Sequence, residues 1–170
     1  MSTRALYSFI GETAADSWNV YKHSDGYPTG AAETLQDAVK YFAWQLPRYE
    51  PDEFAAAFIA AGKASYFLRA ALAKTAKEKA NALMFTAVGE YKSQGGNLRM
   101  MPQGAPLKVA GTNCGDIEYR YEIYQGNDGG LRVKAYGVNA WGDKPKQTLL
   151  LDCPIAEFTP DNADVKELES

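Results

Sequence analysis

The sequence is poor in the residues from which many active sites are built. Histidine occurs once, at His23, which excludes sites that need two or three histidines from one chain. The two cysteines, Cys114 and Cys153, do not form a Cys-x-x-Cys pair, so we expect free thiols and neither a disulfide framework nor a zinc deaminase site. The residue inventory therefore predicts no metal and no other cofactor.

Three widespread motifs are also absent from the sequence. It contains no Gly-x-x-x-x-Gly-Lys-Ser/Thr phosphate loop, no Gly-x-Gly-x-x-Gly after a strand and no Gly-x-Ser-x-Gly elbow. These absences disfavour the standard nucleotide triphosphatases, dinucleotide enzymes and serine hydrolases. An enzyme is therefore the less favoured class.

Long apolar runs are missing as well. The most apolar stretch, residues 54–72, is rich in alanine and is interrupted by Lys63 and Arg69, so it is too polar for a membrane span. No apolar signal segment follows Met1. We expect a cytoplasmic protein without a membrane partner.

Neither sign of charge dominates the chain. Eighteen basic residues against 21 acidic ones give a net charge of −3, whereas a general binder of nucleic-acid phosphates needs a basic footprint. The cations that gather between residues 63 and 79 are interpreted as the solvated face of a helix. A nucleic-acid partner is therefore not expected.

The overall composition is that of a folded protein. Hydrophobic residues make up 46% of the 170 residues and charged residues 23%, close to the averages for globular domains. A chain of this length is enough for one domain with a real core. We predict one domain over residues 1–158 and an acidic, disordered tail over residues 159–170.

The N-terminal half begins with strand signals and continues with helix signals. Strand-forming residues at 4–10 and 18–23, separated by a polar turn, predict a β-hairpin. Apolar residues at helical spacing predict a helix over residues 31–46, a short helix from Pro51, and a third helix over residues 65–87 beyond Gly62. The helical part of the chain ends near Gly89.

The C-terminal half returns to strand signals. Apolar residues alternate over 117–123, a glycine-rich turn follows, and a partner strand returns from Leu131. Further strands are predicted near residues 98–101 and over 148–153. The expected fold is α+β, a mixed domain with an N-terminal hairpin, central helices and C-terminal antiparallel strands.

Charged residues are predicted to pair across the C-terminal strands. The alternation sets Glu118, Arg120 and Glu122 on the outer face, near Arg132 and Lys134. A glycosidase-like pair of carboxylates is conceivable for Glu118 and Glu122. The interleaved arginine favours a surface ladder of ion pairs instead.

The segment from Tyr21 to Pro28 is the most suggestive one in the sequence. Strand alternation places Tyr21 and His23 on one side, and Asp25 can accept a hydrogen bond from the imidazole where the chain turns. The alternative is a purely structural turn at Asp25 that leads through Tyr27 into the helix. Both interpretations stay open.

This segment also carries a family resemblance. Tyr21-Lys22-His23-Ser24-Asp25-Gly26-Tyr27-Pro28, followed by Gly30-Ala31-Ala32, resembles small phage and prophage proteins with a Tyr-x-His-x-Asp-Gly-Tyr-Pro signature. The likeness extends to residues 46–58 and 115–122, and the chain departs from it at Ser24, where an aromatic residue is expected. The resemblance implies a phage-encoded accessory protein in the host cytoplasm. Such proteins include counter-defence factors that sequester nucleotide immune signals.

Together these observations favour a binding protein that captures a small nucleotide-derived ligand without catalysis. Aromatic rings and arginines suit a flat base and its phosphates. The expected ligand-binding residues are Tyr21, His23, Asp25, Tyr27, Arg48, Arg99 and Arg120.

Three alternatives remain open. The first is a protein inhibitor of a host defence enzyme, acting through an exposed apolar patch. The second is a hydrolase with His23 as general base and Asp25 as its orienting partner. The third, a thiol triad of Cys114 or Cys153 with these two residues, is the least favoured, because lone cysteines are usually buried. The patch of the first alternative would consist of Phe42, Trp44, Tyr49 and Phe58.

A homo-oligomer, two-fold or higher, is also expected. A chain of this size rarely encloses a nucleotide alone, whereas two copies can bury one between them. The helix predicted over residues 65–87 is the candidate interface, because its alanines allow close approach and its weak apolar stripe includes Leu68 and Leu72.

Overall fold

The computed structural model describes residues 3–13, 15–22, 24–43, 48–84, 101–103, 117–139 and 146–163. The predictions that concern His23, Trp44, Arg99 and Cys114 lie outside these residues.

The core of the fold is a six-stranded mixed sheet with the order β3-β2-β1-β4-β5-β6. The two central strands, β1 and β4, run parallel, and every other neighbouring pair is antiparallel. The strands are β1 (Ala5–Phe9), β2 (Trp18–Lys22), β3 (Met101–Gln103), β4 (Tyr119–Gln125), β5 (Leu131–Asn139) and β6 (Lys146–Pro154). The predicted α+β class, the N-terminal hairpin and the C-terminal antiparallel strands are confirmed.

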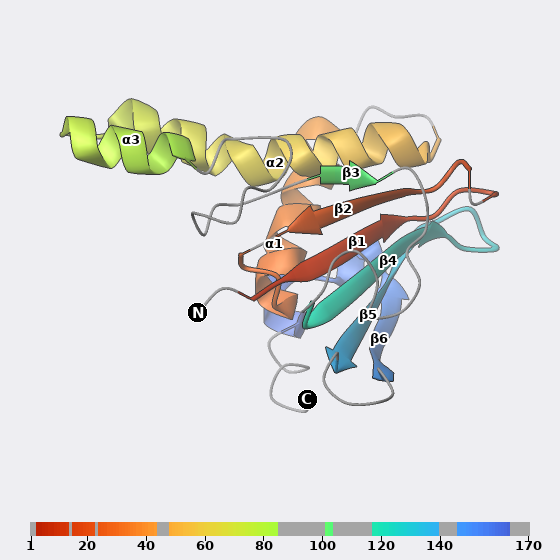
Figure 1. Cartoon of the computed structure of the whole chain (residues 1–170). Helices are drawn as coiled ribbons and strands as arrows, with labels where there is room; N and C mark the ends of the chain where they lie inside the picture. The colour runs from red at the N-terminus through yellow and green to blue at the C-terminus, as the bar shows by residue number, and fades with distance from the viewer. Residues whose placement is uncertain are drawn as a thin grey trace.

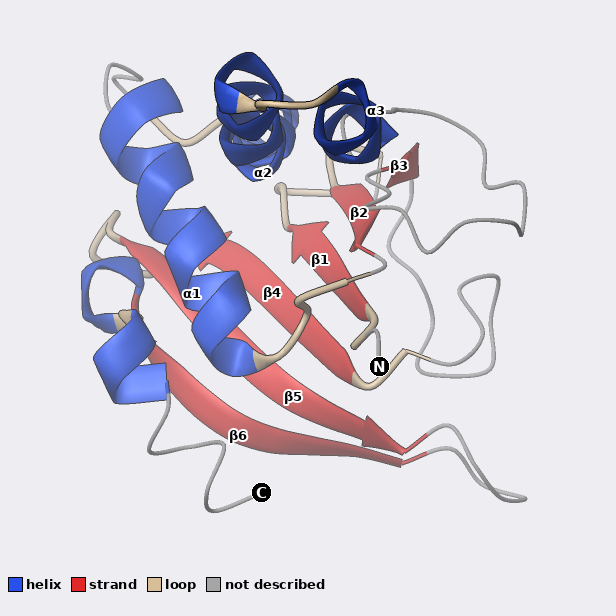
Figure 2. Ribbon diagram, turned by 90° about the vertical axis from the view of Figure 1, so that its left-hand side faces the viewer, coloured by secondary structure: helices blue, strands red, loops and turns tan. Residues whose placement is uncertain are grey.

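The helices lie together on one face of this sheet (Figure 2). They are α1 (Pro28–Asp37), the π-helical turn η1 (Ala38–Phe42), α2 (Pro51–Leu72), α3 (Ala76–Met84) and the short 3-10 helix η2 (Ile155–Glu157). Within the described part of the chain, no helix is both long and apolar enough to cross a membrane.

Two helix boundaries differ from the prediction. The first helix begins at Pro28 rather than Ala31, because a proline with its fixed φ suits the first helical position. The predicted break after Gly62 is wrong, since α2 runs through it to Leu72. The surrounding alanines offset the cost of one glycine, which is about 1 kcal/mol.

The helical segment is instead interrupted between α2 and α3 by a capping box. Thr75 Oγ1 accepts a hydrogen bond from Glu78 N at 3.1 Å. The Glu78 carboxylate in turn accepts from Thr75 N at 3.2 Å and from Lys74 N at 2.9 Å. This reciprocal pattern satisfies amides that the start of α3 leaves without helical partners.

Aromatic rings from β1, β4 and α2 form the centre of the core. The Tyr7 ring lies 4.3 Å from Phe58 and stacks on Tyr121 at 4.9 Å, and Phe9 lies 5.6 Å from both Phe54 and Phe58. Every residue of β1 is buried, as expected for a central strand with a parallel neighbour. Phe54 and Phe58 thus anchor α2 on the sheet.

Only the first half of α2 packs on the sheet. Five of its apolar residues between 54 and 61 are buried, whereas Ala70 is the one buried residue of positions 64–72. The second half projects past the end of the sheet together with α3 (Figure 1). We call residues 64–84 the α2–α3 hairpin.

The charged residues of the C-terminal strands pair differently from the prediction. Arg120 bonds to Glu122 on its own strand, with Nη2 2.9 Å from Oε1. Arg132 bonds to Asp152 across β5 and β6, with Nη2 3.1 Å from Oδ1. Glu122 does lie opposite Lys134 in the register, so the predicted ladder is correct for that pair only.

The start of the predicted tail belongs to the folded part. Ala163 is fully buried, and its N–H donates to Thr159 O at 2.9 Å. Phe158, just before it, is also fully buried and lies 6.0 Å from the Tyr121 ring. Residues 159–163 therefore continue the domain rather than fraying from it.

Candidate functional site

A pocket of about 780 Å³ lies at the carboxyl ends of the two parallel strands. We call it the strand-end pocket. Its volume is within the range of small-ligand sites, and strand carboxyl ends are where open sheets with parallel strands tend to bind ligands. It is lined by Ile10, Gly11, Glu12, Ala15, Asp16, Trp18, Arg48, Tyr49, Glu50, Pro51, Asp52, Tyr124 and Gln125.

The β1–β2 turn forms one wall of this pocket and is held by its own side chains. Ser17 Oγ accepts from Gly11 N at 2.9 Å and donates to Thr13 O at 2.9 Å. Thr13 Oγ1 donates to the Asp16 carboxylate at 2.7 Å. A side chain at Gly11 would meet Asp16 Cβ at 2.7 Å, so only glycine fits there. The wall is therefore pre-formed.

The opposite wall is the segment that leads into α2. Tyr49 is anchored by its hydroxyl, which donates to Ile123 O at 3.1 Å, and its ring meets Phe54 edge-on. Burial raises the pKa of Tyr49, so this hydroxyl stays protonated. Arg48 pairs with Glu50 at the exposed rim. A second pocket of about 280 Å³ shares Arg48 and Tyr49 with the first.

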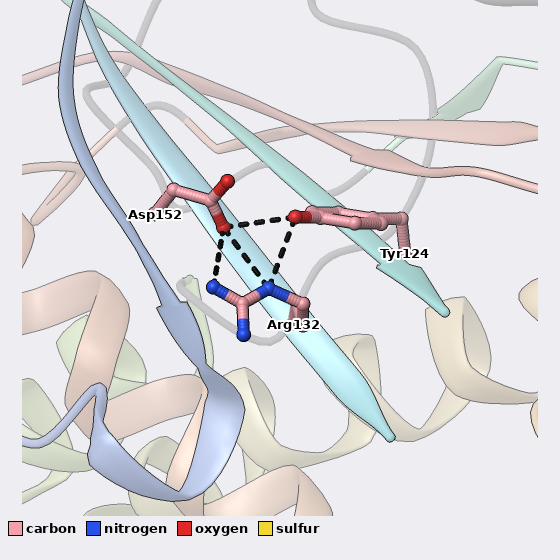
Figure 3. Close-up of polar contacts among 3 residues, drawn as sticks. All are labelled: Tyr124, Arg132 and Asp152. Carbon is pink, nitrogen blue, oxygen red and sulfur yellow. Dashed lines mark hydrogen bonds and ion pairs between the residues drawn. The ribbon is translucent and has the colours of Figure 1, made fainter. Parts of the chain in front are cut away.

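Tyr124 closes the pocket on the side of β4 and is fixed by a polar cluster (Figure 3). Its hydroxyl donates to Asp152 Oδ1 at 2.8 Å and accepts from Arg132 Nε at 3.1 Å. Arg132 also donates to Asp152 from Nε and Nη2. The Lys134 ammonium lies 4.9 Å from the centre of the Tyr124 ring. The ring is thus held from both its hydroxyl and its face.

Carboxylates outnumber cations in the lining of the strand-end pocket. Of the lining residues that the structure describes, four are acidic and Arg48 is the one cation. Three aromatic residues, Trp18, Tyr49 and Tyr124, accompany them in the lining. Among the described residues no group of three acidic, cysteine or histidine side chains is placed to hold a metal ion. The chemistry of this lining suits an organic cation, which carboxylates attract and aromatic faces stabilise.

The segment singled out by the sequence folds as a tightly packed loop at the other end of β1. Asp25 adopts a positive φ of 55°, and a side chain at Gly26 would meet Ala5 Cβ at 2.6 Å. Tyr121 donates its hydroxyl hydrogen to Gly26 O at 2.8 Å. Pro28 then occupies the first turn of α1. Loop geometry therefore accounts for the aspartate, glycine and proline of the signature.

Lys22 is buried and holds this loop in place through hydrogen bonds. Only 4% of the residue is exposed, and its ammonium donates to Thr34 Oγ1 at 3.1 Å and to Asp25 O at 3.5 Å. Burial lowers the pKa of Lys22 to about 8, although the nearby carboxylates of Asp25 and Glu33 oppose the shift. Lys22 shares the helix-facing side of β2 with Trp18 and Val20, which pack in the core.

Two of the predicted ligand residues meet residues of α2. Asp25 and Tyr27 are exposed and lie near Tyr66, whose pKa is raised by burial and further by these two neighbours. The Arg69 guanidinium lies 5.2 Å from the centre of the Tyr66 ring. We call Asp25, Tyr27, Tyr66 and Arg69 the loop surface.

The other described candidates lie elsewhere. Tyr21 and Arg120 both pair with Leu6, so they share the sheet face opposite the helices, about 10 Å apart across two strand spacings. Arg120 is 8% exposed and is engaged by Glu122. Arg48 lies at the strand-end pocket. The structure therefore does not bring the described candidates together in one site.

The residues behind two alternative hypotheses are also placed. Cys153 is buried in β6, and burial raises the pKa of its thiol, which disfavours a nucleophilic thiolate. Phe58 is fully buried and Tyr49 packs against the core, so the predicted apolar patch is wrong for these two residues, while Phe42 is 45% exposed.

Sequence reasoning missed most of the strand-end pocket. Its four acidic residues come from two segments that are far apart in the sequence. By sequence alone, one segment indicates an ordinary turn (Glu12 and Asp16) and the other an ordinary helix start (Glu50 and Asp52). A useful signal was the recurrence of acidic residues directly after the first strand and before the second helix. That signal has meaning only once the turn after β1 and the start of α2 are known to lie side by side. Comparison with family models, curated proteins and solved structures finds no match to this chain.

Proposed function

We propose that this chain is a binding protein whose strand-end pocket captures a cationic, partly apolar group, such as a lysine or arginine side chain or an organic ammonium ion. The observation that carries the proposal is the lining of this pocket, in which four acidic and three aromatic residues surround about 780 Å³. A cation over an aromatic face gains roughly 0.5–2 kcal/mol, depending on its desolvation. One such contact binds a cation only weakly, whereas several aromatic and acidic residues acting together raise the affinity for it.

The carboxylates of the pocket retain capacity for a ligand. Asp16 accepts from Thr13, and Asp52 accepts from Glu53 N at 2.8 Å, yet each carboxylate has about four acceptor positions. Glu50 pairs with Arg48 and offsets the one cation in the lining. The same charges repel phosphates, so a nucleotide is disfavoured at this site.

Titration calorimetry with tetramethylammonium and with a short lysine and arginine peptide tests the proposal. We expect both probes to bind and their affinity to fall as salt is raised. The double variant Glu12→Gln with Asp16→Asn should lose about 5- to 30-fold in affinity, from 0.5–1 kcal/mol per neutralised carboxylate. Asp161→Asn, outside the pocket, is the matched control. The proposal fails if neither probe binds the wild type, or if the double variant binds as well as the control.

A second candidate is favoured by the loop surface. Tyr27 is 37% exposed, and Arg69 lies over the Tyr66 ring. An exposed tyrosine beside an arginine suits stacking on a nucleobase with a charge contact to its phosphate. On this candidate the protein is the sequestering counter-defence factor that the resemblance implies.

The two candidates predict opposite ligand charge and different sensitive residues. A panel of cyclic nucleotides and cyclic ADP-ribose isomers should bind the wild type and lose affinity in Arg69→Ala. The double variant at Glu12 and Asp16 should leave that affinity unchanged. Absence of binding across the panel removes the second candidate and leaves the first intact.

A further inference from the structure

The α2–α3 hairpin is a projecting element with apolar side chains in water. Leu68 is 60% exposed and Leu72 70% exposed, and Phe67 and Leu83 are exposed as well. Leu68 and Leu72 are four residues apart on α2 and therefore share one face of it. Of the α3 side chains that the structure describes, only Ala82 is buried. This hairpin lacks a sheet beneath it and presents apolar groups that a partner can cover.

The hairpin also carries a net positive charge, although the chain as a whole is acidic. Residues 64–84 contain Arg69, Lys74, Lys77 and Lys79 against Glu78 alone, a net charge of +3, while the whole chain carries −3. All four cations are exposed. Glu78 is engaged in the capping box. The tip of the hairpin therefore offers ammonium groups beside Leu72.

The acidic pocket lies at the opposite end of the same helix. Pro51 and Asp52, at the start of α2, line the strand-end pocket, and the hairpin begins 12 residues beyond Asp52. The helix from Asp52 to Leu72 spans about 30 Å, so the tip of the hairpin lies far from the pocket (Figure 1). The hairpin cannot fold back into the pocket of its own chain.

These two ends are complementary in shape and charge. One is concave, acidic and lined by aromatic rings, and the other is convex, basic and apolar. We infer that the occupant of the strand-end pocket is the tip of the α2–α3 hairpin of a second copy of this chain, so that copies associate head to tail. The inference rests on the proposed function, because it names the cationic group that the pocket captures.

Charge distinguishes this arrangement from a two-fold pairing of hairpins. Two hairpins packed on each other bring together two surfaces of net charge +3, and like charges at an interface repel. Head-to-tail contact pairs opposite charges instead. Such a contact is heterologous, so a row of copies keeps one free pocket at one end and one free hairpin at the other. Copies therefore add until a ring closes or a filament grows.

A charge swap tests the inference by light scattering. We expect the wild type to exceed 18.6 kDa, with a mass that rises with concentration and falls with salt. A hairpin variant, Lys74→Glu with Lys77→Glu, and a pocket variant, Glu12→Lys with Asp16→Lys, should each remain at the mass of one copy. An equimolar mixture of the two should regain the higher mass, because the reversed ends attract. This recovery also shows that both variants fold.

Further variants locate the contact. Leu68→Glu and Leu72→Glu should lower self-association at least 10-fold, whereas Lys146→Glu, on the exposed start of β6, should leave it unchanged. A wild type that stays at 18.6 kDa at every concentration overturns the inference. So does a pocket variant that associates as the wild type does, which is the signature of a two-fold pairing of hairpins.

The same samples separate the inference from the proposed function. The hairpin variant keeps an unaltered pocket and is a single copy, so its affinity for tetramethylammonium reports the pocket alone. Probe binding by this variant, together with a monomeric wild type, retains the cation pocket and overturns self-association. Loss of probe binding in this variant overturns the proposed function directly.

Discussion

The two halves of α2 have similar sequences and different surroundings. The first half buries Phe54 and Phe58 against the sheet, whereas the second half leaves Phe67, Leu68 and Leu72 in water. Alanine is frequent in both halves, so helix propensity continues where packing stops. Helix propensity thus determines how long α2 is, and the sheet determines only how much of α2 is buried. The surplus length places a basic surface at a distance from the acidic pocket.

The largest expected contrast is between two phenylalanines of this helix. Phe58→Ala should lower the free energy of unfolding by about 3–5 kcal/mol, because the side chain is fully buried between Tyr7 and Phe9. Phe67→Ala, 55% exposed, should change it by less than about 0.5 kcal/mol. Urea unfolding at low protein concentration measures both. Equal losses would show that the hairpin is as tightly packed as the core.

A second contrast concerns buried and exposed lysines. The folded state releases the Lys22 proton at a pKa of about 8, whereas the unfolded state keeps it up to its ordinary value of 10.5. Between pH 8 and pH 10 the unfolded state therefore binds more protons, and stability rises with pH. The rise is on the order of 2–3 kcal/mol at 1.36 kcal/mol per unit.

Unfolding free energies measured at intervals from pH 7 to pH 10.5 test this expectation. Lys22→Met should flatten the rise, and Lys79→Met, which removes an exposed ammonium of α3, should leave it unaltered. Above pH 10 the raised pKa values of the buried Tyr7 and Tyr49 act in the opposite direction. A rise that persists in Lys22→Met would assign the pH dependence to another group.

The smallest expected effect is confined to α3. Thr75→Ala removes the hydroxyl that accepts from Glu78 N and should cost about 1 kcal/mol locally. Amide hydrogen exchange should quicken in α3 while the amides of β1 keep their protection, because helix ends open separately from the core. Equal acceleration in both elements would place α3 in the same cooperative unit as the sheet.

Much of the fold followed from local patterns in the sequence. Alternation in residues 117–123 identified β4, and Pro51 marked the start of α2. The parallel pairing of β1 with β4 had no local signal, because it joins strands more than a hundred residues apart. The sequence interpretation placed a helix break after Gly62, because glycine disfavours helix. The break lies instead at the capping box of Thr75 and Glu78, between α2 and α3.

The candidate site was less predictable than the fold. Asp25, Gly26 and Pro28 stand out in the sequence, but their conformations serve the loop that Lys22 and Tyr121 hold. The residues of the strand-end pocket share no spacing, because they meet only after the turn beyond β1 and the start of α2 come together. Polar residues are common in turns, so these acidic residues do not stand out in the sequence. Only the arrangement of strands and helices brings them together.

The parallel β1–β4 pair should also delay completion of the sheet during folding. Ala5 pairs with Tyr119, so β1 waits for its second neighbour until most of the chain exists. Closing so long a loop costs entropy before any contact repays it, and such topologies fold slowly. Substitutions in β1 or β4 should therefore slow refolding, whereas substitutions in the α2–α3 hairpin should mainly accelerate unfolding. During synthesis, β1 cannot pair with β4 until Ile123 has left the ribosome, so we expect Tyr7 and Phe9 in the first hairpin to need protection in the nascent chain.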